Sequence, residues 1–333
     1  MISAVLSGAN DWNEIEEFGH NQLDWLGKYG DFKHGVPAHD TINRVFASIN
    51  PDEFSLCFHK LTQNISKPIE KEIVAIDGKT ICNSVNKLKN MSAIHIVSAY
   101  AQKRGITLAQ KAVSQKSNEI TAIPELLSFL DIENTIVTID AMGCQKEIAK
   151  QIKKKKADYI LSVKGNQASL QENIKDTIRF QKPESFDSHT DFGHGRIETR
   201  NCSVYNNLTN IENTQAWIGL KTIIKIESER IFKSTGAITR QTRYYISSTE
   251  ASAEQFNKWI RSHWAIENNL HWMIDVNFKE DYSTKQAANA AQNFNTVSKL
   301  ALYLLCRFPN GSIKQKRLRA ALNQKFRSDL LNF

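Results

Sequence analysis

The sequence predicts a mixed α/β fold: a sheet flanked by helices, with a helical unit before it and a mostly β insertion within it. Between residues 72 and 165, short β-rich runs alternate with helical periodicity in the order βββαβαβ. Strand-like runs then continue through residues 166–252, and helical spacing returns at Ala253. Because an ordinary connection has about 4 to 6 residues, we expect residues 166–252 to form an insertion.

Residues 1–66 are expected to form a helical N-terminal unit. Gly35 and Pro37 mark a loop before a second helical run, TINRVFASI. The chain begins inside an apolar helical pattern with no capping residue ahead of it, which predicts a truncated start. A polar segment containing Pro68 ends the unit near residue 66. The apolar residues at helical spacing are Trp12, Ile15, Phe18, Leu23, Trp25 and Leu26.

The insertion is expected to divide the sheet domain into residues 67–165 and a helical remainder, residues 253–306, followed by a basic tail, residues 307–333. The first part has expected strands at 72–77, 93–101, 106–114, 134–140 and 157–165, and helices at 118–130 and 144–156. The insertion has expected strands at 196–205, 217–228 and 239–248. Later helices are expected at 260–281, 284–306 and 318–333.

The composition points to a protein with an anionic partner. The 333 residues carry 43 Lys and Arg against 35 Asp and Glu, a net charge of +8, and nucleic acid is the commonest partner of such a chain. The five cysteines form no Cys-x-x-Cys pair, which favours reduced thiols and a cytoplasmic protein. No apolar run approaches the about 20 residues of a membrane span, so we expect no membrane partner.

Three acidic residues are the candidate catalytic and metal-binding groups. Asp77 and Asp140 end two expected strands, and Glu267 lies inside an expected helix after the insertion. If that helix packs beside the sheet, three carboxylates converge, and such oxygen ligands suit Mg²⁺ or Mn²⁺. Two ions about 4 Å apart can activate an attacking oxygen and stabilise a leaving oxygen at phosphorus.

Each acid also has an ordinary structural interpretation. Asp77 in an Asp-Gly pair can simply make a turn, and Asp140 can equally be a turn or cap residue. Glu267 can pair with Arg261, His263 or His271 at helical spacing. Two further possibilities stay open: a transition-metal set formed by His263, Glu267 and His271, and Asp275, Glu280 or Asp281 as the third acid.

Several basic or polar residues are candidates for DNA contact. Lys164 at the end of the fifth expected strand, with Asn166 beside it, could contact a phosphate or simply lie in solvent. Arg196 and Arg200 alternate with apolar or small residues, so they share one face of a strand with Glu198. That face could lie on the DNA backbone or make cross-strand ion pairs. His263 and His271 could orient Glu267 or meet DNA.

Seven ordered motifs together resemble one known family. They are GVPAHDTINRVF (35–46), VAIDGKT (74–80), TIDAMGCQ (138–145), YILSVKGNQ (159–167), HGRIETR (194–200), YYISS (244–248) and RSHWAIENNLHWMIDVNFKED (261–281). The chain is similar to the H-repeat-associated family, DDE-type transposases of the ISAs-one group of bacterial insertion sequences. The resemblance implies a ribonuclease-H-like core interrupted by a β insertion, with its acidic triad at Asp77, Asp140 and Glu267.

The resemblance also implies a function. A DDE transposase cuts and joins DNA at the ends of an insertion sequence with two Mg²⁺ or Mn²⁺ ions. The implied partners are double-stranded terminal repeats and target DNA, a second copy of the chain on that DNA, and the nucleoid as the place of action. The wider superfamily has Tyr, Arg and Lys where this chain has Ile260, His263 and Ile274. An inactive DNA-binding remnant, or a metal-dependent nuclease or phosphatase without strand transfer, remain the alternatives.

Overall fold

The structure is a computed structural model of the 333-residue chain. It describes residues 1–65, 67–84, 93–113, 119–193, 195–282, 285 and 287–332. The chain divides into two compact units. Unit 1 comprises Met1–Lys67, Gly78–Asn118 and Ile266–Phe333, and unit 2 comprises Pro68–Asp77 and Glu119–Ala265.

The strands form a nine-stranded mixed sheet in the order β3-β2-β1-β4-β5-β9-β8-β7-β6. Strand β4 pairs in parallel with both β1 and β5. Strands β2 and β3 pair in the antiparallel sense, and so do the successive pairs β5–β9, β9–β8, β8–β7 and β7–β6. This confirms the expected mixed sheet flanked by helices, with the ribonuclease-H-like order. The bounds are β1 (Ile73–Ile81), β2 (Ile94–Ala101), β3 (Ile106–Val113), β4 (Ile136–Ile139), β5 (Asp158–Val163), β6 (Ser185–Gly193), β7 (Arg196–Tyr205), β8 (Thr222–Phe232) and β9 (Ile238–Ser247).

Some elements differ from the sequence prediction. Strand β6 was not expected, because Ser, Asp, His and Gly dominate SFDSHTDFG and hide its alternation. The strand expected at 217–228 begins at Thr222, since a 3-10 turn (Thr214–Ala216) and Gly219, whose φ is +78°, precede it. The single helix expected at 260–281 is broken into α9 (Ala253–His263), a π-helical turn (Ile266–His271) and α10 (Trp272–Phe278).

The C-terminal helices also differ from the prediction. The C-terminal helix expected at 318–333 is really two helices, α12 (Ile313–Leu322) and α13 (Gln324–Leu331), because Ser312 and Asn323 each cap a new helix. Helix α11 (Ala290–Cys306) ends where the expected 284–306 helix ends but begins later, because residues 287–289 form a turn in which Ala288 has a φ of +38°. The expected start at residue 284 and the unit boundary at residue 66 lie outside the described residues.

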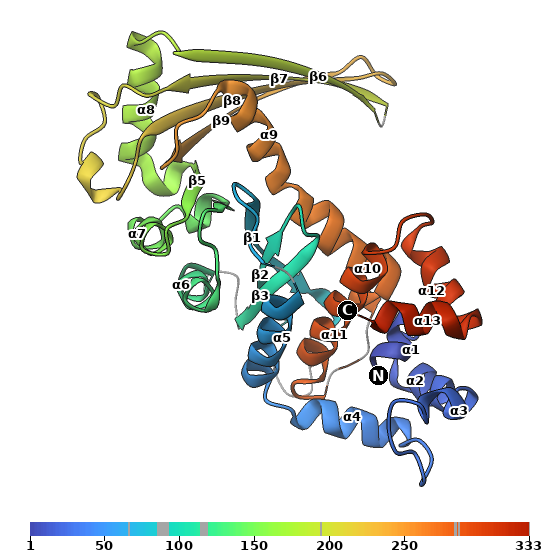
Figure 1. Ribbon diagram of the computed structural model, residues 1–333. Coiled ribbons are helices and arrows are strands. Elements are labelled where there is room, and N and C mark those ends of the chain that lie inside the picture. Colours follow the sequence, from blue (N-terminus) through green and yellow to red (C-terminus); the bar gives the residue numbers. More distant parts are fainter. Residues whose placement is uncertain are drawn as a thin grey trace. The chain divides into compact units, whose positions relative to one another are not determined.

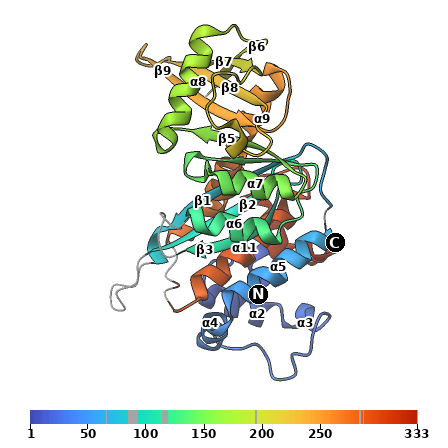
Figure 2. The ribbon, with the colours of Figure 1, turned by 90° about the vertical axis from the view of Figure 1, so that its left-hand side faces the viewer.

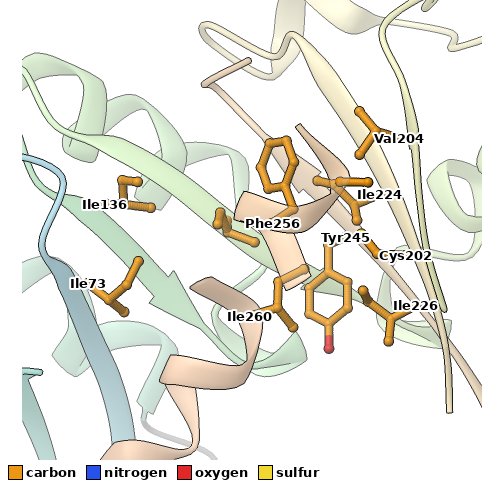
Figure 3. Packing of buried hydrophobic residues seen from close by; sticks show 11 residues of the cluster. Ile73, Ile136, Cys202, Val204, Ile224, Ile226, Tyr245, Phe256 and Ile260 are labelled. Atoms are coloured by element: carbon orange, nitrogen blue, oxygen red, sulfur yellow. The ribbon is translucent and has the colours of Figure 1, made fainter. Parts of the chain in front are cut away.

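The core of unit 2 lies between α9 and one face of the sheet (Figure 3). A capping box starts this helix, with Ser252 and Gln255 exchanging side-chain to backbone hydrogen bonds. Phe256, fully buried, and Ile260 then point into a cluster of buried residues from six strands. Those strand residues are Ile73, Ile136, Ile160, Cys202, Val204, Ile224, Ile226 and Tyr245.

The opposite face of the parallel strands is covered by α6 (Glu119–Phe129) and α7 (Lys146–Lys154), which pack against each other (Figure 2). Side chains alternate along β4, so Ile139 points to this face while Thr138 points toward α9. Helix α8 (Ala168–Phe180) follows β5 and lies within the β6 to β9 end of unit 2 (Figure 1). In unit 2, α6 and α7 therefore cover one face of the parallel strands, and α9 packs on the other.

Unit 1 is mostly helical, as expected for the N-terminal residues. Helices α5 and α11 pack on β3 and on each other. Within this packing lies Lys299, whose ammonium donates to Ser98 Oγ at 2.8 Å and Gln110 Oε1 at 2.6 Å. None of the helices among the described residues is long and apolar enough to span a bilayer. The N-terminal helices are α1 (Ile2–Leu6), α2 (Trp12–Asn21), α3 (Leu23–Leu26), α4 (His39–Ser48) and α5 (Pro51–Ile65).

Candidate active site

Two aspartates follow paired residues of adjacent parallel strands in unit 2. Ile76 of β1 is in register with Ile139 of β4. Asp77 directly follows Ile76, and Asp140 directly follows Ile139. Parallel strands in register direct successive side chains to the same faces. The two half-buried carboxylates therefore emerge together on the face that α9 covers, where the pairing of β1 with β4 ends. Strand β1 does not end at Asp77, as the sequence predicted, but continues to Ile81.

The loop carrying Asp140 is held by hydrogen bonds. The Asp140 carboxylate accepts from the backbone N–H of Met142 at 3.0 Å and so caps a 3-10 turn. Asn166 donates its side-chain amide to the Ala141 carbonyl at 2.6 Å. A Cβ on Gly143 would lie 2.2 Å from the Ile139 side chain, so only glycine fits there. Asn166, a candidate for DNA contact, therefore braces the aspartate loop.

His263, the last residue of α9, lies beside both aspartates. Its Nδ1 is 2.9 Å from the hydroxyl of Thr138, two residues before Asp140 on β4. Burial lowers the pKa of the imidazole, while the charges of Asp77 and Asp140 act in the opposite direction. An electrostatic effect of both carboxylates requires proximity. The structure thus brings three of the predicted residues, Asp77, Asp140 and His263, together in unit 2.

The other two predicted residues of this stretch, Glu267 and His271, belong to unit 1. They lie in the π-helical turn, where Glu267 is exposed and its neighbours Ile266 and Leu270 are buried. π-Helical turns are rare and are frequent at functional sites. Trp264 is 37% exposed, and the guanidinium of Arg243 lies 5.0 Å from the centre of its ring.

The alternative third acids are engaged elsewhere in unit 1. Lys79 of β1 hydrogen-bonds to Asp275 and, at 2.8 Å, to Glu280, with Asp281 at 4.0 Å. Burial disfavours the charged amine, but the charge of Glu280 and the hydrogen bond to Asp275 outweigh this and raise the pKa of Lys79. These acids are thus ion-pair partners of a lysine.

The α9-facing side of the β6 to β9 sheet carries a cluster of arginines. Register places Arg196 and Arg200 on the same face as Cys202, whose side chain packs under α9. Arg261 of α9 contacts Asp191 of β6 at 2.5 Å, and Arg200 lies 3.8 Å from the same carboxylate. We call the set Arg196, Arg200, Arg230, Arg243 and Arg261 the arginine face.

Acidic side chains offset part of this charge. Glu198 lies 3.2 Å from Arg230 on the neighbouring strand and 3.5 Å from Arg196. Burial, and then the charge of nearby Arg261, lower the pKa of Arg200. The cross-strand pairing left open by the sequence is therefore present. The arginine face still holds more arginines than the acids Asp187, Asp191 and Glu198 that share it.

Sequence reasoning missed three groups that the structure places near the predicted ones. Thr138 lies on the aspartate face of β4, which the alternation of the TIVTID run could have indicated. The charge of Arg243 lowers the pKa of His263. The position of Arg243 depends on the pairing of β9 with β8 in the insertion, which the sequence does not indicate. Lys79 follows Asp77 in DGKT, and nothing local indicates its carboxylate partners. Lys164 is exposed at the end of β5.

The aspartate pair supplies part of a divalent-cation site. The carboxylates of Asp77 in β1 and of Asp140 directly after β4 are hard oxygen ligands of the kind that Mg²⁺ and Mn²⁺ prefer. Among the described residues, no group of three or more His, Cys, Asp and Glu side chains is arranged to hold a metal ion. The aspartates therefore fit as two ligands of a site that needs a further ligand.

Comparison with known proteins decides the family. Residues 68–304 match the family model described as "Transposase DDE domain". The chain belongs to this family of DDE transposases. Residues 1–62 match a second model, "DDE_Tnp_1-associated", which accompanies the first. The two matches cover both the helical N-terminal residues and the sheet with its insertion.

Similar transposases share most of this chain. "Putative transposase YncI" of Escherichia coli O157:H7 is 43% identical over 99% of this chain and 87% of its own length. "H repeat-associated putative transposase YhhI" of Escherichia coli (strain K12) is 39% identical over 99% of this chain and 90% of its own. A cryo-EM structure of the piggyBac transposase synaptic complex with hairpin DNA aligns with a TM-score of 0.45 and 11% identity, covering all of this chain and 71% of that one. The resemblance to the H-repeat-associated family is confirmed.

Proposed function

We propose that this DDE transposase cuts double-stranded DNA at the ends of an insertion sequence and joins the freed 3′ ends to target DNA. Asp77, Asp140 and Glu267 would hold two Mg²⁺ or Mn²⁺ ions. The observation that carries the proposal is the register of β1 and β4, which sends Asp77 and Asp140 out together beside His263. Family membership supplies the reaction class.

The position of Glu267 in the chain supports it as the third ligand. Phe256 and Ile260 point to the sheet face, and His263, at the end of α9, reaches Thr138. Glu267 is the first acidic residue after His263, four residues further along the chain. Asp275, Glu280 and Asp281 surround Lys79 instead. Glu267 is therefore the acid that we assign to the aspartate pair.

The chain's own residues would hold the reacting groups. Divalent ions bound by the acids would activate the attacking oxygen and stabilise the charge that develops at phosphorus. Asp77 would offer oxygens from within β1 and Asp140 from just after β4. Their positions are fixed by the sheet and by the turn that Asn166 braces. Neutral His263 fills the space beside them and holds the end of α9 on β4. Water would attack first, and the freed 3′-hydroxyl would attack the target.

The arginine face is our proposed surface for the DNA backbone. Arginine makes bidentate contacts to phosphate, and such contacts position a duplex without reading its sequence. Arg243 lies near enough to His263 to lower its pKa, so this face reaches the aspartates. Exposed Lys164 is a second candidate at the end of β5. We further propose that two copies assemble on the terminal repeats and act on nucleoid DNA in the cytoplasm.

Cleavage of a labelled element-end duplex tests the proposal. The wild type is expected to cut only with Mg²⁺ or Mn²⁺, and Asp77→Ala, Asp140→Ala and Glu267→Ala are each expected to lose cleavage while still binding DNA. Full activity in one variant would remove that residue from the site. Salt-sensitive binding without cleavage at any metal concentration would indicate a DNA-binding remnant, and cleavage without joining would indicate a nuclease.

A further inference from the structure

Lys79 links two segments of unit 1 that follow the proposed acids Asp77 and Glu267. It lies two residues after Asp77 on β1, so the two side chains leave the same face of the strand. Its ammonium donates to Asp275 of α10 and to Glu280 just beyond α10. All three partner groups, including Asp281 at 4.0 Å, come from the segment after Glu267.

The link is largely shielded from water. The side chain of Lys79 is 16% exposed, that of Asp275 28% and that of Glu280 8%. Asn295 of α11 donates to the second oxygen of Glu280, so both oxygens of that carboxylate are engaged. Removing one partner from a buried ion pair leaves an uncompensated charge, which is far more costly than losing an exposed pair. The link therefore restricts where α10 can lie on β1.

Glu267 and α10 belong to one continuous helical segment. The π-helical turn that carries Glu267 runs directly into α10, and Asp275 lies eight residues further, roughly 12 Å along the axis at 1.5 Å per residue. Ile266, Leu270, Ile274 and Phe278 form one buried stripe of this segment, each at most 2% exposed. A stripe buried at every fourth residue fixes the rotation of the helix. A group that anchors Asp275 thus also fixes Glu267.

We propose that Lys79 is a positioning residue: it fixes the helix that follows Glu267 on the part of β1 that directly follows Asp77. This inference rests on the proposed function, because it takes both acids as metal ligands. Lysine has three N–H donors, and here three carboxylates face its ammonium. Lys79 is therefore not offered to a DNA phosphate, although it follows directly on DG in the motif VAIDGKT.

Mn²⁺ binding tests the role apart from catalysis. Free Mn²⁺ is titrated into wild-type protein and followed by its electron paramagnetic resonance signal, which is lost on binding. The test variant is Lys79→Met, and Lys79→Arg restores the charge. Lys111→Met is the matched control, because Lys111 also pairs with an aspartate, Asp52 at 3.2 Å, on a strand of the same sheet. DNA cleavage and DNA binding are measured on the same samples.

Lys79→Met is expected to weaken Mn²⁺ binding by about tenfold or more, as loss of a group that orients metal ligands does. Its DNA affinity should stay within about twofold, since the arginine face is untouched. Lys79→Arg should recover most of the metal affinity, and Lys111→Met should keep all of it. If Lys79→Met does not fold, Asp275→Asn, which leaves Glu280 paired, is expected to weaken Mn²⁺ binding in the same direction.

Wild-type Mn²⁺ affinity in folded Lys79→Met, or in Asp275→Asn where Lys79→Met does not fold, overturns the positioning role. If the wild type in that experiment binds Mn²⁺ and cuts DNA, the proposed function stands although the positioning role fails. A wild type that neither binds Mn²⁺ nor cuts DNA overturns both proposals together. The two failures are therefore distinguished by the wild-type measurements alone.

Discussion

The hydroxyl of Thr138 and Nδ1 of His263 lie 2.9 Å apart, joining the second residue before Asp140 to the end of α9. Thr138 is 3% exposed, so this hydrogen bond is made away from water. It anchors the end of α9 on the strand that leads into the second aspartate. Thr138 and His263 both lie in unit 2, so the bond fixes the end of α9 within that unit.

Replacing Thr138 by valine should impair catalysis more than folding. Valine keeps the shape but loses the hydroxyl, which leaves the imidazole nitrogen without this partner and costs about 1 to 3 kcal/mol. We expect cleavage to fall by about tenfold, with DNA affinity unchanged. The control is Thr138→Ser, which retains the hydroxyl. Equal activity of the serine and valine variants would show that the hydrogen bond has no role.

Replacing Arg243 by alanine should weaken DNA binding through the loss of one phosphate contact. The slope of log affinity against log salt should decrease by about one. Binding to unrelated sequences should weaken equally, since phosphate contacts carry no sequence information. Fluorescence anisotropy at several salt concentrations measures both. Arg179→Ala on α8 is the control, because Arg179 is exposed and outside the arginine face, and an identical loss there would contradict a specific surface.

Truncating Phe256 should destabilise unit 2. This side chain is fully buried between α9 and the strands of the cluster in Figure 3. Phe256→Ala should lower the free energy of unfolding by about 3 to 5 kcal/mol, measured by chemical denaturation. Phe180, 71% exposed on α8, serves for comparison. Phe180→Ala should change stability by less than about 0.5 kcal/mol, and a loss of similar size in both variants would refute the assigned core.

Lys299 should make stability depend on pH. Burial lowers its pKa from 10.5 to about 7, with Glu280 raising it and Lys79 lowering it further. Between these values the unfolded chain binds more protons than the folded one, so the free energy of unfolding rises with pH. From pH 7 to 9 the gain is of the order of 2 kcal/mol.

Comparison with Lys299→Met isolates this contribution. Chemical denaturation at pH 7, 8 and 9 gives the slope for both proteins. The variant lacks the titrating amine, so it should lose the rise that the wild type shows, whatever other groups contribute. Parallel slopes for the two proteins would mean that Lys299 does not titrate in this range.

Much of the fold could be predicted because its signals are local. The alternation in EIVAID and the apolar run of NTIVTID predict two strands, and both are present. Strand β4 ends just before Asp140, whereas β1 runs on past Asp77 to Ile81. Strand β6 could not be predicted in the same way, because SFDSHTDFG owes its conformation to pairing with β7. The break at Ile266–His271 was also hidden, since a π-helical turn leaves the spacing of apolar residues nearly helical.

The candidate site shows the same division. Asp77 and Asp140 could be chosen because each comes directly after an apolar run, and β1 and β4 pair directly. Arg243 was missed because its neighbour His263 comes from another element. Arg261 was considered only as a partner of Glu267, whereas it contacts Asp191 of β6. The carboxylate partners of Lys79 lie about two hundred residues away in the chain. Local sequence patterns do not predict contacts between residues so far apart in the chain.

Joining of a pre-cut end measures the central claim most directly. A labelled element-end duplex with a free 3′-hydroxyl is incubated with plasmid target and Mg²⁺, and joined product is counted for the wild type and Asp140→Asn. The folding and DNA binding of Asp140→Asn are checked first. The account predicts metal-dependent joining by the wild type and none above background by Asp140→Asn. Equal joining by both proteins, or joining without a divalent ion, would contradict it.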